Sequence, residues 1–205
     1  AEFARFTAPE AMTPPPTGVD MTAVIAHLSR TLTRNAIITN GAGNFTVWVH
    51  RFFQYKQPHT ELAPTSGAMG YGLPAALAAK LRHPDRIVVC VAGDGDFLMY
   101  PQELATALEV GSPFIVLVVN NGMYGTIRMH QERRFPGRIS ATRIAGPDMV
   151  ALAKAFGAYA ERVERTEDFP AAFERATSAG TVVLIDLTVD PAQITPAMRL
   201  QEPRS

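Results

Sequence analysis

Two runs of consecutive apolar residues restrict the fold of this chain more than any other feature of its sequence. Residues 87–91 and 114–119 are apolar throughout, without the alternation that marks a half-exposed strand. Strands of this kind are covered on both faces, as in parallel sheets. Helical patterns separate the strands, so the sequence predicts a doubly wound α/β domain with a mainly parallel sheet and helices on both faces.

The same patterns give approximate positions for the elements. Asp20 is a suitable N-cap for the first helix, and glycines interrupt the pattern after two of the strands. In this architecture, ligands bind just beyond the carboxyl ends of the strands. The expected helices cover residues 21–34, 70–82, 101–110, 148–156 and 167–178, and the expected strands cover residues 36–39, 86–92, 114–119 and 182–187.

The proline distribution predicts the domain limits. Pro9 and the run of prolines at 14–16 stand among few apolar residues, which is typical of an extended linker that enters from a preceding domain. We therefore expect a linker over residues 1–20, one domain over residues 21–190 and a tail over residues 191–205, and we interpret the chain as the C-terminal third of a longer polypeptide or, alternatively, a separate subunit that needs a partner.

Charge and cysteine content exclude several classes of function. Nineteen Lys and Arg balance nineteen Asp and Glu, so nothing supplies the positive field that nucleic acid or an anionic membrane would require. No apolar stretch reaches the roughly 18 residues of a membrane span, and we expect a cytoplasmic protein. Cys90, the only cysteine, lies within an apolar run and is expected to be a buried structural thiol.

Polar residues follow the two apolar strands at the points where they end. Gly93-Asp94-Gly95 comes after one strand, and Asn120-Asn121 comes after the next. A right-handed crossover through the intervening helix would place the two motifs side by side. Either motif alone fits an ordinary turn. Together they offer a carboxylate oxygen, an amide oxygen and nearby carbonyls, which are the hard ligands that Mg²⁺ accepts alongside phosphate oxygens.

This pair of motifs resembles the signature of thiamine-diphosphate-dependent enzymes, in which Gly-Asp-Gly is followed, after a helix and a strand, by paired asparagines. Residues 66–76 resemble the segment that opens a helix in the acetolactate synthase-like branch, and the resemblance extends over residues 40–187. It implies the thiamine-diphosphate-binding fold and the C-terminal diphosphate-binding domain of a 2-oxo acid decarboxylase or carboligase that uses thiamine diphosphate and Mg²⁺.

The resemblance also implies a role for each matched residue. Asp94 and Asn121 would bind Mg²⁺ through their side chains, and Met123 would bind it through its backbone carbonyl. Gly67 would offer its carbonyl to the amino group of the pyrimidine. Met69 would wedge between the two rings and bring that amino group close to the thiazolium C2–H, although by pattern alone it is a core residue at a helix start. Backbone groups of the following residues would contact the diphosphate: Gly43, Asn44, Phe45, Gly95, Asp96, Tyr124 and Gly125.

The resemblance implies that part of the active site lies outside this chain. No residue here is expected to act as the catalytic glutamate, which belongs to a pyrimidine-binding domain of the same or a partner polypeptide. The isolated chain would then be inactive, and the assembly would be a homodimer or tetramer acting on a 2-oxo acid. His130 stands where some acetolactate synthases carry a tryptophan, which is a departure from that branch. The basic residues 133–138 fit a solvated loop or a surface facing an anionic substrate.

Three other functions remain as alternatives. A Mg²⁺-dependent phosphohydrolase would use Asp94 and Asp96 as nucleophile and acid/base, but the only lysine that follows them is Lys154. A nicotinamide-binding module would use the glycines of residues 41–43, which form an incomplete fingerprint. A non-catalytic domain could have retained the fold alone, although it would have no need to keep Met69 together with the two polar motifs.

Overall fold

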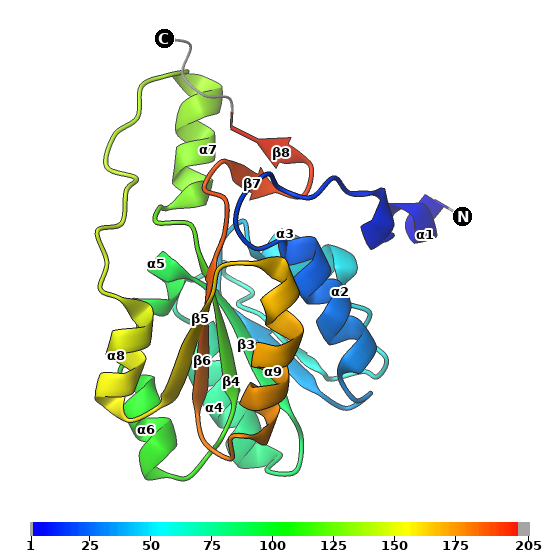
Figure 1. Cartoon of the computed structure of the whole chain (residues 1–205), viewed down its shortest axis with the longest axis vertical. Helices are drawn as coiled ribbons and strands as arrows, with labels where there is room; N and C mark the ends of the chain where they lie inside the picture. The colour runs from blue at the N-terminus through cyan, green and yellow to red at the C-terminus, as the bar shows by residue number, and fades with distance from the viewer. Residues whose placement is uncertain (1, 201–205) are drawn as a thin grey trace.

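The computed structural model describes residues 2–200 and forms a six-stranded sheet at the centre of an α/β domain (Figure 1). The strand order is β2-β1-β3-β4-β6-β5, and every neighbouring pair is parallel, which confirms the predicted parallel sheet. The strands are β1 (Ile37–Asn40), β2 (Glu61–Leu62), β3 (Val88–Gly93), β4 (Ile115–Asn120), β5 (Tyr159–Val163) and β6 (Val183–Thr188).

Helices cover both faces of this sheet, as a doubly wound fold requires. One face packs against α2 (Met21–Thr31), α3 (Thr46–Phe52) and α9 (Phe169–Ser178). The other face packs against α4 (Gly72–Arg82), α6 (Glu103–Glu109) and α8 (Met149–Phe156). The two faces therefore bury separate apolar clusters, and the central strands are covered on both sides.

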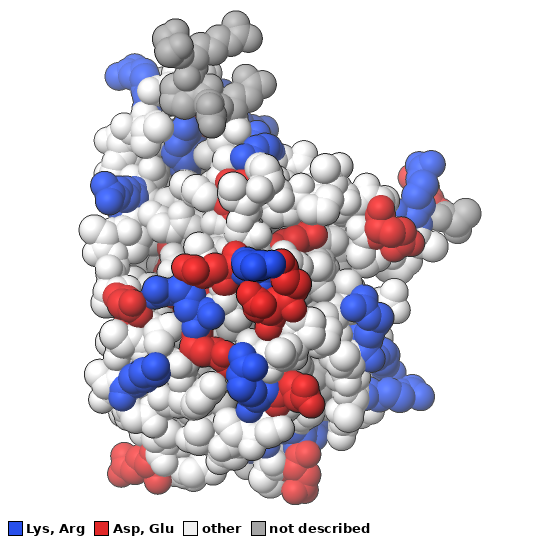
Figure 2. Space-filling model, in the orientation of Figure 1, with Lys and Arg blue, Asp and Glu red and all other residues white. Residues whose placement is uncertain are grey.

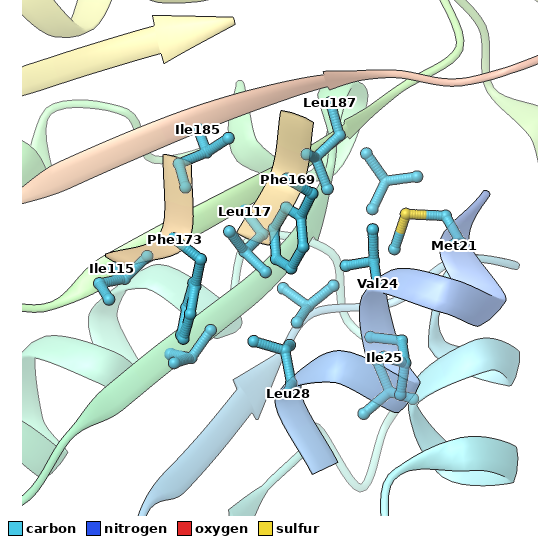
Figure 3. Close-up of a cluster of buried hydrophobic side chains, with 14 of the residues drawn as sticks. Met21, Val24, Ile25, Leu28, Ile115, Leu117, Phe169, Phe173, Ile185 and Leu187 are labelled. Atoms are coloured by element: carbon cyan, nitrogen blue, oxygen red, sulfur yellow. The ribbon is translucent and has the colours of Figure 1, made fainter. Parts of the chain in front are cut away.

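The larger of the two clusters shows why the central strands are apolar throughout. Figure 3 shows side chains of α2 and α9 packing together with side chains of β4 and β6, on the face of the sheet that these two helices cover. Aromatic rings of α9 stack within this cluster, with 5.6 Å between the ring centroids of Phe169 and Phe173. The labelled members are Met21, Val24, Ile25, Leu28, Ile115, Leu117, Phe169, Phe173, Ile185 and Leu187.

Several expected boundaries differ from the structure for local reasons. The glycines of residues 93–96 predict a loop, and this prediction is wrong. After Gly93 the chain enters the short helix α5 (Asp94–Phe97). Both aspartates lie in its first turn, where the helix dipole favours them. The helix predicted from residue 70 begins only at Gly72, because Gly70 has a φ of 83°. The first helix ends at Thr31 rather than Arg34, since Leu32 is already extended.

Other elements were not predicted because their sequences carry weak periodicity. They are α1 (Glu2–Phe6), η1 (Pro9–Ala11), α3, α7 (Gly125–Arg134), η2 (Thr166–Asp168), β2, β5 and the hairpin of β7 (Gln193–Thr195) and β8 (Met198–Arg199). The expected linker thus contains α1 and η1, and the expected tail contains the hairpin, while residue 1 and residues 201–205 lie outside the described part. Figure 1 shows α7 and the hairpin above the carboxyl edge of the sheet, where they face the loops that follow β3 and β4.

The surface agrees with a chain of balanced charge. On the face shown in Figure 2, Lys and Arg side chains stand next to Asp and Glu side chains rather than gathering in a patch of one sign. Within residues 2–200, no helix is long and apolar enough to cross a membrane.

Candidate functional site

The polar motifs that follow β3 and β4 meet at the carboxyl edge of the sheet. The two strands are paired up to Gly93 and Val119, so their ends lie at the same level. The Oδ2 of Asp94 accepts a hydrogen bond of 2.8 Å from the backbone N–H of Gly122, and its Oδ1 accepts one of 2.9 Å from Gly95. The side-by-side arrangement predicted from the crossover is therefore confirmed.

The turn after β4 presents two further oxygens near Asp94. The amide oxygen of Asn121 accepts a hydrogen bond of 3.1 Å from the backbone N–H of Met123. Met123 also forms an antiparallel bridge with Arg143, and the two flanking bonds, of 2.8 and 2.9 Å, join its neighbours to the 142–144 segment. In such a pair the N–H and C=O of the bridged residue point away from the partner segment. The Met123 carbonyl is therefore directed to the same side as the Asn121 amide.

These groups form a donor set that suits a hard divalent cation. A carboxylate oxygen keeps lone pairs free after accepting one N–H, and so does an amide oxygen. Mg²⁺ takes such ligands together with waters and phosphate oxygens. Within residues 2–200, no three His, Cys, Asp or Glu side chains gather around a common point, so a cation here would depend on amide, carbonyl and phosphate oxygens as well as Asp94.

Both aspartates of α5 are buried at this edge, each with 3% of its surface exposed. Burial raises the pKa of Asp94 to about 6, although backbone N–H groups, Gly95 first, act in the opposite direction. Burial likewise raises the pKa of Asp96 to about 6, against the N–H groups of Gly70 and Ala42. A buried carboxylate without a counter-charge is costly, and a bound cation would lower that cost at Asp94.

A cleft runs over this edge and brings most of the predicted site residues together. It encloses about 890 Å³ of space between the protein atoms, part of it open to solvent. Gly67 is exposed and is not part of its lining, whereas all the other predicted residues are. Those residues are Gly43, Asn44, Phe45, Met69, Asp94, Gly95, Asp96, Asn121, Met123, Tyr124 and Gly125.

Contacts between side chain and backbone fix the loops that form this cleft. The amide oxygen of Asn44 accepts a hydrogen bond of 2.9 Å from the hydroxyl of Thr126, which ties the loop after β1 to the start of α7. A Cβ on Gly95 would lie 2.6 Å from the ring of Tyr124, so this ring packs directly on the glycine backbone. The loop after β1 and the start of α5 thus both contact residues 124–126, and all three segments line the cleft.

Sequence reasoning missed the walls that come from the two ends of the chain. Thr13, Pro15 and Asp20 line the cleft from the N-terminal side, and Asp190 and the 193–196 turn line it from the C-terminal side. A bridge between Gly18 and Val189 and the ion pair of Arg199 with Asp190, at 2.7 Å, hold these walls in place. No sequence motif marks these residues. The one available signal was that Asp190 and residues 193–196 follow the carboxyl end of β6 at Thr188, because ligands bind beyond such strand ends.

Two residues singled out in the sequence, Lys154 and His130, lie outside the cleft. Lys154, which a phosphohydrolase would need, is exposed on α8 and is not part of the cleft lining. His130 is exposed on α7 and is likewise outside the lining. Neither side chain is placed to act on a ligand held at Asp94.

Comparisons with known proteins agree with the geometry of this edge. Residues 41–187 match the family model described as "Thiamine pyrophosphate enzyme, C-terminal TPP binding domain". The chain is 36% identical over 181 residues to the acetolactate synthase large subunit of Corynebacterium glutamicum, covering 84% of this chain and 29% of that protein. It is 34% identical over 158 residues to the mitochondrial acetolactate synthase catalytic subunit of Saccharomyces cerevisiae, covering 77% of this chain and 23% of that protein.

A solved structure gives the same result for the fold. The thiamine diphosphate-dependent 4-hydroxybenzoylformate decarboxylase of Rhodococcus jostii RHA1 superposes with a TM-score of 0.81 at 28% identity. The match covers 87% of this chain and 34% of that chain. The present chain thus spans about a quarter to a third of the length of the relatives that it matches.

Proposed function

Because this chain belongs to the thiamine pyrophosphate enzymes as a C-terminal cofactor-binding domain, we propose that it supplies the diphosphate-binding half of an active site. The reaction that we propose is decarboxylation or carboligation of a 2-oxo acid by an acetolactate synthase-like enzyme. The observation that supports this most is the meeting of Asp94, Asn121 and Met123 at the edge of the cleft.

In this proposal the protein's own residues bind and orient. Asp94 and Asn121 would hold Mg²⁺ with their side-chain oxygens, and Met123 would hold it with its carbonyl. Backbone N–H groups of the segments 43–45, 95–96 and 124–125 would bind the diphosphate. Met69, half-buried in the cleft lining, would contact the rings of the cofactor. When bound, thiamine diphosphate supplies an electron sink for breaking the bond between the carboxyl and carbonyl carbons.

The other half of the site would come from a pyrimidine-binding domain of the same or a partner polypeptide. We propose that this domain brings its pocket to the end of the cleft at Met69; Gly67, two residues earlier, is exposed and outside the lining. Exposed apolar side chains stand beside Gly70 at the same end, namely Tyr71, Met99 and Tyr100. Such a patch is typical of a surface that another domain covers. We therefore propose a dimer or tetramer in the cytoplasm, with the isolated chain inactive.

Release of carbon dioxide from 2-oxo acids tests this function. This domain, assayed together with its pyrimidine-binding domain, should decarboxylate at least one simple 2-oxo acid. It should do so only when both thiamine diphosphate and Mg²⁺ are present. Asp94→Ala should lower the rate by about 100-fold or more, because it removes the only carboxylate of the metal site. The isolated chain of residues 1–205 should release none. Turnover that continues without Mg²⁺, or at the native rate in Asp94→Ala, would contradict the proposal.

A further inference from the structure

Asp96 lies two residues after Asp94, and its side chain points away from the metal site toward two other segments. Its Oδ1 accepts a hydrogen bond of 2.7 Å from the backbone N–H of Gly70 and one of 3.3 Å from that of Ala42. One carboxylate thus joins α5, the loop after β1 and the segment that precedes α4. These three segments are far apart in the sequence, since Gly70 and Ala42 lie 26 and 54 positions from Asp96.

The packing around this carboxylate is as specific as its hydrogen bonds. A Cβ on Gly41 would lie 2.0 Å from Oδ1 and 2.2 Å from Oδ2 of Asp96. Gly41 has no positive φ, so it is the missing side chain rather than an unusual backbone conformation that the contact requires. The loop after β1 can approach Asp96 this closely only because residue 41 is a glycine.

The second oxygen of the carboxylate makes this arrangement costly. Within the described residues, Oδ2 of Asp96 is buried and has no hydrogen-bond partner. A buried charged oxygen left unpaired destabilises a fold, and a serine, which lacks this second oxygen, would avoid that cost. Stability alone therefore does not account for an aspartate at this position.

The two segments that Asp96 holds carry the residues expected to face the cofactor. Met69 immediately precedes Gly70, and the 43–45 segment follows Ala42. Both line the cleft together with Asp94. We propose that Asp96 is a positioning residue, whose carboxylate sets the spacing between the ring-wedging Met69 and the diphosphate loops without touching the cofactor itself. This inference rests on the proposed function only for what the two segments bind.

Two substitutions at this position separate positioning from general stability. Asp96→Ala removes the acceptor, whereas Asp96→Asn keeps an oxygen that can accept both N–H groups. In Asp96→Ala we expect the Gly70 amide to exchange its hydrogen about 10-fold faster and the dissociation constant for thiamine diphosphate with Mg²⁺ to rise about 10-fold. Asp96→Asn should restore both within about 3-fold, and Asp85→Ala, an exposed aspartate in the turn before β3, should change neither.

A second pair of variants tests the packing. Gly41→Ala places a methyl group where the carboxylate lies and should reproduce the faster Gly70 exchange of Asp96→Ala. Combining the two should add nothing, because the methyl group then fills the space that the carboxylate left. Effects that simply add would indicate two independent losses of stability and would overturn the proposal.

The two measurements fail for different reasons. Unchanged Gly70 exchange in Asp96→Ala would overturn the positioning role, and so would an Asp96→Asn variant as impaired as Asp96→Ala. The native chain could bind no thiamine diphosphate while the Gly70 amide still exchanges faster in Asp96→Ala. In that case the proposed function fails, but the structural role of Asp96 in holding the two segments remains.

Discussion

At the scale of single residues, Asp94 and Asp96 show how two identical side chains divide their tasks. Asp94 turns toward the end of β4 and accepts an N–H from Gly122. Asp96, on the opposite side of the same short helix, accepts an N–H from Gly70. The sequence predicted the first task, because the paired motifs imply it. It could not predict the second, since the bonds of Asp96 depend on loops that lie 26 and 54 positions away.

Cys90 gives a prediction at the same scale. It is fully buried on β3, and desolvation raises the pKa of its thiol to about 12 despite the opposing hydrogen bond of Thr39. Because the thiolate is the reactive form, an aromatic disulfide reagent at pH 8 should modify the folded chain at least about 100-fold more slowly than the unfolded chain. Absorbance of the released thiolate gives the rate. Fast modification of the folded chain would show that β3 is accessible or that the strand opens readily.

At the scale of elements, one network connects the edge of the sheet to the turn that presents Asn121. Asp186 on β6 is completely buried and accepts hydrogen bonds from Asn120, at 3.0 Å, and Arg162, at 2.9 Å. Arg162 also bonds Asp148, the N-cap of α8, at 2.9 Å. The network joins β4, β5, β6 and α8. Because it includes Asn120, the last residue of β4, it stabilises the start of the turn that carries Asn121.

Removing the cation of this network should destabilise the domain. Arg162→Ala leaves the buried Asp186 with Asn120 alone, and we expect the free energy of unfolding to fall by about 1–2 kcal/mol, reduced from the value for a fully buried pair because Arg162 is 38% exposed. Arg175→Ala is the matched control, since Arg175 pairs with Glu161 while exposed to solvent, which screens the pair, and its removal should change the free energy of unfolding much less. Urea denaturation measures both. Equal losses would mean that Asp186 does not depend on Arg162.

The elements also show where prediction from the sequence ends. The strands β3 and β4 were predictable because each contains five consecutive apolar residues, and such a run is typical of a strand covered on both faces. The edge strand β5 was not, since its polar residues Glu161 and Arg162 are adjacent, interrupt the apolar pattern and are held by ion pairs with neighbouring elements. α7 was ambiguous because it buries only Arg128 and lacks a clear apolar face. Its position depends on tertiary contacts such as that of Thr126 with Asn44.

At the scale of the whole molecule, both ends of the chain help to build the cleft that the central strands support. The expected linker and the expected tail both contribute walls, through Pro15 and the 193–196 turn. The division into residues 1–20, 21–190 and 191–205 stays a prediction, but the bridge from Gly18 to Val189 shows that the first and last segments pack on the domain. Gly67, two residues before Met69 of the lining, is exposed and outside the cleft, and we propose that the second domain binds on this side.

Calorimetric titration of thiamine diphosphate into this chain tests the central claim most directly. The native chain and Asp94→Ala are compared with and without Mg²⁺, and Asp85→Ala serves as the control for loss of an exposed carboxylate. We predict weak binding that requires Mg²⁺, persists in Asp85→Ala and disappears in Asp94→Ala. Binding that persists without Mg²⁺ or in Asp94→Ala would contradict a diphosphate held through a metal ion at the ends of β3 and β4.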